Sequence, residues 1–137
     1  MLENTLQNRA WWNQLEPQWR KAFGMAVLKH TEEPDDADLE MLFKIETIRM
    51  AGPAASFPNM RIELTNLSGL AHLCNLKIVI ITHHHVQSIE EVSCLKNLKS
   101  LFLFNKFKIK HLQRRWDKLG NRSRKSGLQS KCRWHFN

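Results

Sequence analysis

The sequence has few cysteines and no long apolar run, and each shortage excludes a class of protein. Its 137 residues contain three cysteines, Cys74, Cys94 and Cys132, an odd number with no CxxC spacing. This usage argues against a disulfide framework and a structural zinc site, so a reducing cytoplasm is the expected compartment. No stretch reaches the roughly 18 apolar residues of a membrane span, and the first residues do not resemble a signal peptide. We therefore expect no contact with a membrane.

Acidic residues are almost missing from the last part of the chain. Residues 1–105 carry 10 Lys and Arg against 12 Asp and Glu, whereas residues 106–137 carry 11 against one acid, Asp117. The net charge of +8 therefore comes from the C-terminal segment alone. Any argument about binding to a polyanion concerns this segment and not the rest of the chain.

An internal repeat of 22 residues occupies the middle of the chain. Apolar residues recur every three positions from Leu64 to Val79, and another follows two places later at Ile81. A spacing of three is typical of a 3₁₀-like segment, and a step of two is typical of a short strand. We expect neighbouring units to stack so that residues 79–81 pair in parallel with residues 101–103. The apolar pairs related by a shift of 22 are Leu67 and Ile89, Leu70 and Val92, Leu73 and Leu95, Leu76 and Leu98, Val79 and Leu101, and Ile81 and Leu103.

This repeat resembles the leucine-rich-repeat family, in the 22-residue form of bacterial internalin-like proteins. The family motif LxxLxLxxN reads here from Leu76 to His84 and from Leu98 to Lys106. The asparagine position of the motif thus holds His84 and Lys106, and Asn105 stands one place before the second of them. The family resemblance implies an α/β fold in the form of a short solenoid with parallel strands.

The resemblance covers residues 42–105, and the solenoid itself is expected over residues 45–105. A first strand is expected at Ile48–Met50, which lies nine residues further from the second strand than one repeat allows. The surplus falls in a Gly- and Pro-rich loop at residues 51–59. The alternative interpretation is that Ile45 and Ile48 end the preceding helix.

A helical N-terminal cap is expected over residues 1–44, because the open end of a solenoid core must be covered. Apolar residues at helical spacing between 8 and 28 predict a first helix, and Pro17 offers the alternative of a helix that begins near Glu16. The proline and acids of residues 32–36 predict the start of a second helix.

Two conspicuous groups of side chains have ordinary interpretations. The tryptophans Trp11, Trp12 and Trp19 are interpreted as packing of the cap, with a tryptophan-lined ligand pocket as the alternative. The run His83-His84-His85 directly follows a strand, so neighbouring rings point in different directions. It is interpreted as a polar turn, and a metal site is the alternative.

The repeat stops at residue 106. Residues 106–137 are expected to form a basic tail, partly helical at 109–119 or disordered, and this helix is a candidate C-terminal cap. Without such a cap, the strand at 101–103 is expected to be an exposed edge that promotes self-association. A frameshift near codon 106 in a longer array is a hypothesis for the break. The positions that should continue the core hold no apolar residue: His111, Arg114, Asp117, Gly120, Ser123 and Lys125.

The function expected from the repeat is binding of a protein partner on the concave face of the solenoid. No catalytic motif is found, so neither an enzyme nor a cofactor is expected. The alternatives are nucleic-acid binding through the basic and aromatic tail, or a truncated and non-functional repeat fragment. Four of the six predicted partner-binding residues are apolar, as is typical of an interaction surface, and the alternative is that the cap or the tail folds back over them. They are Ile78, Ile80, Thr82, Ser100, Phe102 and Phe104.

Overall fold

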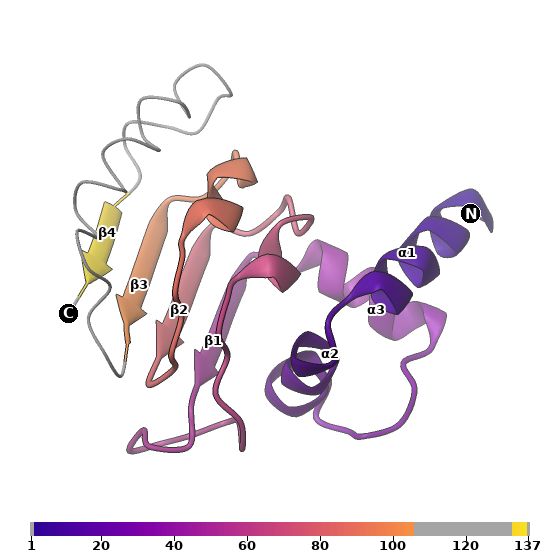
Figure 1. The fold of residues 1–137 in the computed structure, drawn as a ribbon. Coiled ribbons are helices and arrows are strands. Elements are labelled where there is room, and N and C mark those ends of the chain that lie inside the picture. The colour runs from indigo at the N-terminus through magenta and orange to yellow at the C-terminus, as the bar shows by residue number, and fades with distance from the viewer. Residues whose placement is uncertain (1, 106–132, 137) are drawn as a thin grey trace.

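The computed structural model describes residues 2–105 and 133–136, and it places helices at one end of a parallel sheet (Figure 1). The chain is therefore a mixed α/β protein, as predicted. The candidate cap helix at 109–119 lies outside the described residues. Within the described part of the chain, no helix combines the length and the apolar character needed to cross a lipid bilayer.

The first 44 residues supply three α-helices: α1 (Leu2–Gln14), α2 (Pro17–Phe23) and α3 (Asp36–Lys44). A π-helical turn, η1 (Gly24–Leu28), continues α2. The prediction of one helix across residues 8–28 is wrong, and the alternative start near Glu16 is confirmed. Pro17 is the first residue of α2, where its fixed φ suits the helix and its missing N–H costs no hydrogen bond.

The predicted second helix is confirmed as α3. Its start is fixed by a reciprocal cap, because the side chain of Asp35 accepts from the Asp38 N–H at 2.8 Å and that of Asp38 accepts from the Asp35 N–H at 3.2 Å. Leu39 and Leu42 are fully buried and form the apolar side of this helix. The helix ends at Lys44, so the alternative that it extends through Ile48 is wrong.

Four strands form one sheet in chain order: β1 (Thr47–Ala51), β2 (Ile78–Thr82), β3 (Ser100–Phe104) and β4 (Arg133–Phe136). All neighbouring pairs are parallel. The predicted strands are confirmed, and Val79 pairs with Leu101 and Ile81 with Leu103, at the expected shift of 22. Between strands the chain makes short 3₁₀ turns, η2 (Ser68–Leu70) and η3 (Glu90–Cys94), which contact each other.

The spacing of three places one row of apolar side chains inside. The two rows that the 22-residue shift relates are alike in being completely or almost completely buried. They are Leu67, Leu70, Leu73, Leu76, Val79 and Ile81 in one unit, and Ile89, Val92, Leu95, Leu98, Leu101 and Leu103 in the next.

Strand β4 corrects the interpretation of the tail. Residues 133–136 lie beside β3, with Trp134 paired to Leu101 and Phe136 paired to Leu103. The third strand is therefore not the edge of the sheet in the described part of the chain, and we do not propose self-association through it. The offset from β3 to β4 is 33 residues instead of 22, so a search at the fixed repeat length does not detect this strand.

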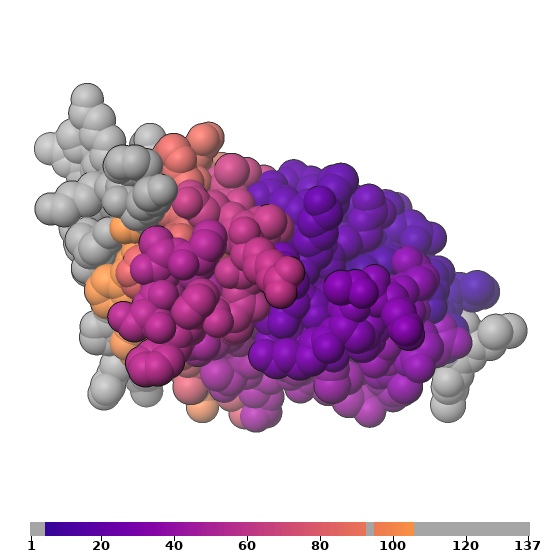
Figure 2. Space-filling model, turned by 90° about the horizontal axis from the view of Figure 1, so that it is seen from below, coloured from indigo at the N-terminus to yellow at the C-terminus, as the bar shows by residue number. Residues whose placement is uncertain are grey.

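The helical region joins the sheet through a tryptophan. Trp19 of α2 is fully buried, and its indole Nε1 donates to Oδ1 of Asn66 at 2.9 Å. Gly69 of η2 makes room for the ring, because a Cβ at this position would lie 2.2 Å from Cδ2 of Trp19. Figure 2 shows the helical region, in indigo and violet, packed directly against the magenta segment that follows β1.

The tryptophans serve mainly in this packing, as predicted. Trp11 lies 4.7 Å from Phe43 of α3 in an edge-on arrangement, measured between ring centroids, and 5.7 Å from Phe23 of α2. Trp12 is 4% exposed. These aromatic contacts tie α1, α2 and α3 into one apolar cluster that continues into the core beneath the sheet.

Candidate functional site

Side chains alternate between the two faces of the sheet, and this alternation creates the candidate site. In β2 and β3 every second residue is buried, and the residues between them are half-buried or exposed. We call the face that carries the half-buried and exposed residues, as formed by β1, β2 and β3, the open face. All six predicted partner-binding residues lie on it: Ile78, Ile80, Thr82, Ser100, Phe102 and Phe104.

The register of the strands fixes how these six residues face one another. Ile78 pairs with Ser100, Ile80 with Phe102, and Thr82 with Phe104. Neighbouring parallel strands lie about 4.8 Å apart, so each pair forms part of a continuous row across the sheet. Phe104 is 37% exposed, so it is one of the exposed large apolar side chains in the described part of the chain.

Strand β1 adds a charged residue that the sequence analysis did not select. Arg49 is exposed and pairs in register with Ile80, so it extends the row of Ile80 and Phe102 to the first strand. Its guanidinium donates to the backbone oxygen of Phe57 in the loop after β1. The two-residue alternation that selected Ile80 also applies to β1, so Arg49 could have been found from the sequence.

The carboxyl ends of the strands are held by a buried histidine. His84 is fully buried, its Nδ1 accepts from the Leu64 N–H at 2.9 Å, and its Nε2 lies 3.0 Å from the backbone oxygen of Met50. This geometry requires the neutral ring with its proton on Nε2, since Nδ1 receives a hydrogen bond and Nε2 donates one. Burial lowers the pKa of His84 below its ordinary value of 6.5, which favours the same neutral form.

Asn105 binds buried backbone groups in the corresponding way one unit later. Its Oδ1 accepts from the Val86 N–H at 2.9 Å, and its Nδ2 donates to the Val86 oxygen at 2.8 Å. Val86 lies 22 residues after Leu64, the backbone partner of His84. The motif position of the family would place this residue at 106, so the turn is one residue shorter in this unit.

The three histidines at 83–85 differ in burial and in their contacts. His84 is buried and binds two backbone groups, whereas His83 and His85 are exposed. His83 adopts a φ of 60°, which turns the chain sharply after β2. Among the described residues, no group of three or more His, Cys, Asp or Glu side chains is arranged to hold a metal ion.

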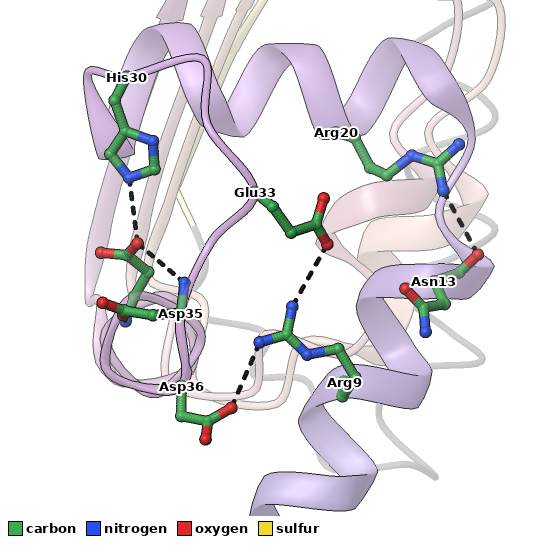
Figure 3. Close-up of polar contacts among 8 residues, drawn as sticks. Arg9, Asn13, Arg20, His30, Glu33, Asp35 and Asp36 are labelled. Atoms are coloured by element: carbon green, nitrogen blue, oxygen red, sulfur yellow. Dashed lines mark hydrogen bonds and ion pairs between the residues drawn. The ribbon is translucent and has the colours of Figure 1, made fainter.

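A cavity of about 490 Å³ lies in the helical region, beside α2 and the segment after η1. Trp12 lines this cavity together with Met25 and Leu28, whereas Trp19 lies in the core beneath Gly69. One wall is held in place by Arg9, which pairs with Glu33 and Asp36, each at 3.3 Å (Figure 3).

Polar contacts of the same wall involve a second pair. His30 Nε2 lies 3.0 Å from Oδ2 of Asp38, which also caps α3. These contacts are accounted for by the need to fasten the segment between η1 and α3, whose residues are mostly exposed. The polar groups of this wall are thus engaged with one another, and we take the open face as the stronger candidate for a binding site.

Comparison with known proteins finds no match to this chain among protein-family models, curated proteins or solved structures.

Proposed function

We propose that the chain is a short leucine-rich-repeat solenoid that binds a protein partner on its open face, without catalysing a reaction. The observation that carries the proposal is the accessible apolar surface of paired strands. Ile80 pairs with Phe102 in register, and Phe104, two residues along, is 37% exposed. Apolar side chains gathered on one face of a sheet are typical of interaction surfaces.

The repetition of backbone contacts supports the solenoid. Asn75 donates from Nδ2 to the Phe43 oxygen at 2.7 Å, and Asn97, 22 residues later, donates to the Cys74 oxygen at 2.8 Å. The buried His84 and Asn105 repeat a second contact at the other end of the strands. Successive units thus satisfy their backbones in the same way, as expected of stacked repeats.

We place this binding in a reducing compartment, the cytoplasm. Cys74 is a free and exposed thiol. Exposed free cysteines are uncommon where the surroundings are oxidising, since they form disulfides there. The chain also has the odd number of cysteines that argues against a disulfide framework.

Selection from a displayed library of unconstrained peptides tests the binding function. The full chain is immobilised, and the affinity of each enriched peptide is measured for the wild type, Phe102→Asp and Lys96→Glu. Phe102→Asp should weaken binding about tenfold or more, as for a central interface residue. Lys96→Glu is the matched control, because Lys96 is an exposed residue in the connection before β3.

The folded state of each variant is checked by circular dichroism and by its urea midpoint. Enriched peptides that lose affinity with Phe102→Asp and keep it with Lys96→Glu would support the proposal. Equal affinity for the wild type and a folded Phe102→Asp would contradict it. If both variants bind equally and affinity falls steeply in high salt, the result would instead favour binding through the basic tail.

A further inference from the structure

Within β1–β3, a row of three residues crosses the middle of the open face from a charge to an aromatic ring, and the same register continues to His135 of β4. Arg49 in β1 pairs with Ile80 in β2, and Ile80 pairs with Phe102 in β3. With strands about 4.8 Å apart, the two ends of the row are separated by about 10 Å. A partner that covers this row meets a cation at one end and apolar surface over the rest.

The charge of Arg49 is not balanced on the open face. The eight exposed or half-buried residues of this face in β1–β3 include no acid: Thr47, Arg49, Ile78, Ile80, Thr82, Ser100, Phe102 and Phe104. Ion pairs in the described part of the chain engage other cations, such as Lys77 with Glu46 at 2.9 Å. Arg49 donates to a neutral carbonyl, that of Phe57.

This arrangement sets a requirement on the partner. Covering a guanidinium with protein removes its water, and a charge that is covered without an opposite charge is costly. A carboxylate over Arg49 offsets this cost. Apolar side chains are needed next to it, because Ile80 and Phe102 follow in the row.

The spacing of the row fits an α-helix that lies across the strands. One helical turn rises about 5.4 Å, and neighbouring strands lie about 4.8 Å apart. Residues separated by three or four, and by seven, lie on one side of a helix. Three such residues therefore meet three successive strands with an accumulated mismatch of about 1 Å over the row, which long side chains absorb.

We propose that the open face binds an amphipathic helix of a partner protein. An Asp or Glu of this helix lies over Arg49, and apolar residues three or four and seven positions away lie over Ile80 and Phe102. This inference rests on the proposed function, since it names the ligand of the same face. It adds the sign of the charge, the order of the residues and the conformation of the bound segment.

The test uses a displayed library of helix-forming peptides in which three positions on one face, at i, i+4 and i+7, are randomised. Selection on the full wild-type chain should enrich an acid at one end position and apolar residues at the other two. Selection on Arg49→Glu should enrich Lys or Arg at the acidic position. Arg49→Gln should remove the charge preference. This neutral variant distinguishes loss of the positive charge from a folding defect caused by the glutamate.

Affinities of single peptides make the result quantitative. Replacing the selected acid by Gln or Asn should lower affinity for the wild type about fivefold, the scale of a partly exposed ion pair. The same replacement should have no effect on binding to Arg49→Gln. Lys96→Glu should behave as the wild type in both measurements.

The outcomes separate this inference from the function on which it rests. Helical peptides that depend on Phe102 but show no acid preference, or no response to Arg49→Glu, overturn the inference and leave the binding face intact. Ligands that depend on Phe102 and come only from the unconstrained library overturn the helical conformation. A library that yields no ligand dependent on Phe102 overturns both proposals.

Discussion

His84 and Asn105 occupy corresponding places in successive units, although one is an imidazole and the other a carboxamide. His84 receives the N–H of Leu64, 20 residues earlier, and Asn105 receives the N–H of Val86, 19 residues earlier. Each side chain closes the turn after a strand by satisfying buried backbone. The shared requirement is an acceptor and a donor on one buried side chain, and the neutral imidazole meets it as the amide does.

Removing the imidazole should destabilise the protein. His84→Ala leaves the Leu64 N–H and the Met50 oxygen without their partner, and each unsatisfied buried group costs about 1–3 kcal/mol. We expect the free energy of unfolding to fall by about 2–6 kcal/mol, measured by urea denaturation. His83→Asn is the control, because His83 is exposed and asparagine tolerates its φ of 60°. Equal losses in both variants would contradict the role of His84.

The stability should also depend on pH through His84. Its pKa is lowered in the folded state, mainly by burial, and the hydrogen bond to the Met50 oxygen opposes this shift only in part. Between the lowered pKa and 6.5 the unfolded chain binds more protons, so stability rises with pH in this window. The contribution of His84 is complete above 6.5 and is lost as the pH falls through the window.

Paired measurements isolate this effect from other titrating groups. The urea midpoint is followed from neutral to mildly acidic pH for the wild type and for His84→Asn, which keeps a donor and an acceptor but does not titrate. We expect the wild type to lose more stability on acidification than the variant. The lowered pKa values of Glu16 and Glu40 affect both proteins alike, at pH values below 4.5. Parallel curves across the window would contradict the prediction.

The strands were predictable because their signal is local and periodic. Ile48, Val79 and Leu101 each stand in an apolar pattern with a step of two, and the structure has a strand at each of them. The open face followed from the same alternation. The predicted set of residues on this face was incomplete only because Arg49 is charged and does not fit an apolar pattern.

Other features depend on contacts between distant segments, and sequence spacing does not reveal these. Strand β4 has the apolar alternation of Trp134 and Phe136, but its offset of 33 residues and its basic surroundings conceal it. The roles of His84 and Asn105 rest on hydrogen bonds to backbone atoms, whose positions follow from the fold. Polar residues of this kind are ambiguous until the strands are placed.

Gly69 should tolerate no larger residue. A Cβ at this position would lie 2.2 Å from Cδ2 of Trp19, which is fully buried and held by its hydrogen bond to Asn66. Gly69→Ala therefore displaces the ring or the η2 turn, and overpacking of this kind costs about 1–3 kcal/mol. Thermal unfolding followed by near-ultraviolet circular dichroism reports both stability and the tryptophan environment. Ser68→Ala, in the same turn, is the control, and an unchanged melting point for Gly69→Ala would show that the junction is loosely packed.

Asn59 should protect the outer edge of the sheet. β1 is the first strand, and successive residues of a strand direct their backbone groups to alternate sides. Met50 faces β2 through its contact with His84, so Arg49 and Ala51 face outward. The Asn59 side chain covers this edge, because its Nδ2 donates to the Arg49 oxygen and its Oδ1 accepts from the Ala51 N–H, each at 2.8 Å.

Loss of this cover should lower stability and promote association. Asn59→Ala removes two hydrogen bonds, each worth about 0.5–1.5 kcal/mol, so the free energy of unfolding should fall by about 1–3 kcal/mol. The uncovered N–H and C=O groups form an edge that recruits other chains, and sedimentation velocity should show association that rises with protein concentration. Asn97→Ala is the matched control, because Asn97 donates to the Cys74 oxygen in a connecting segment and covers no strand edge. If both variants sediment as the wild type does over the whole concentration range, the edge of β1 is protected by the rest of the 52–58 loop, and Asn59 contributes to stability alone.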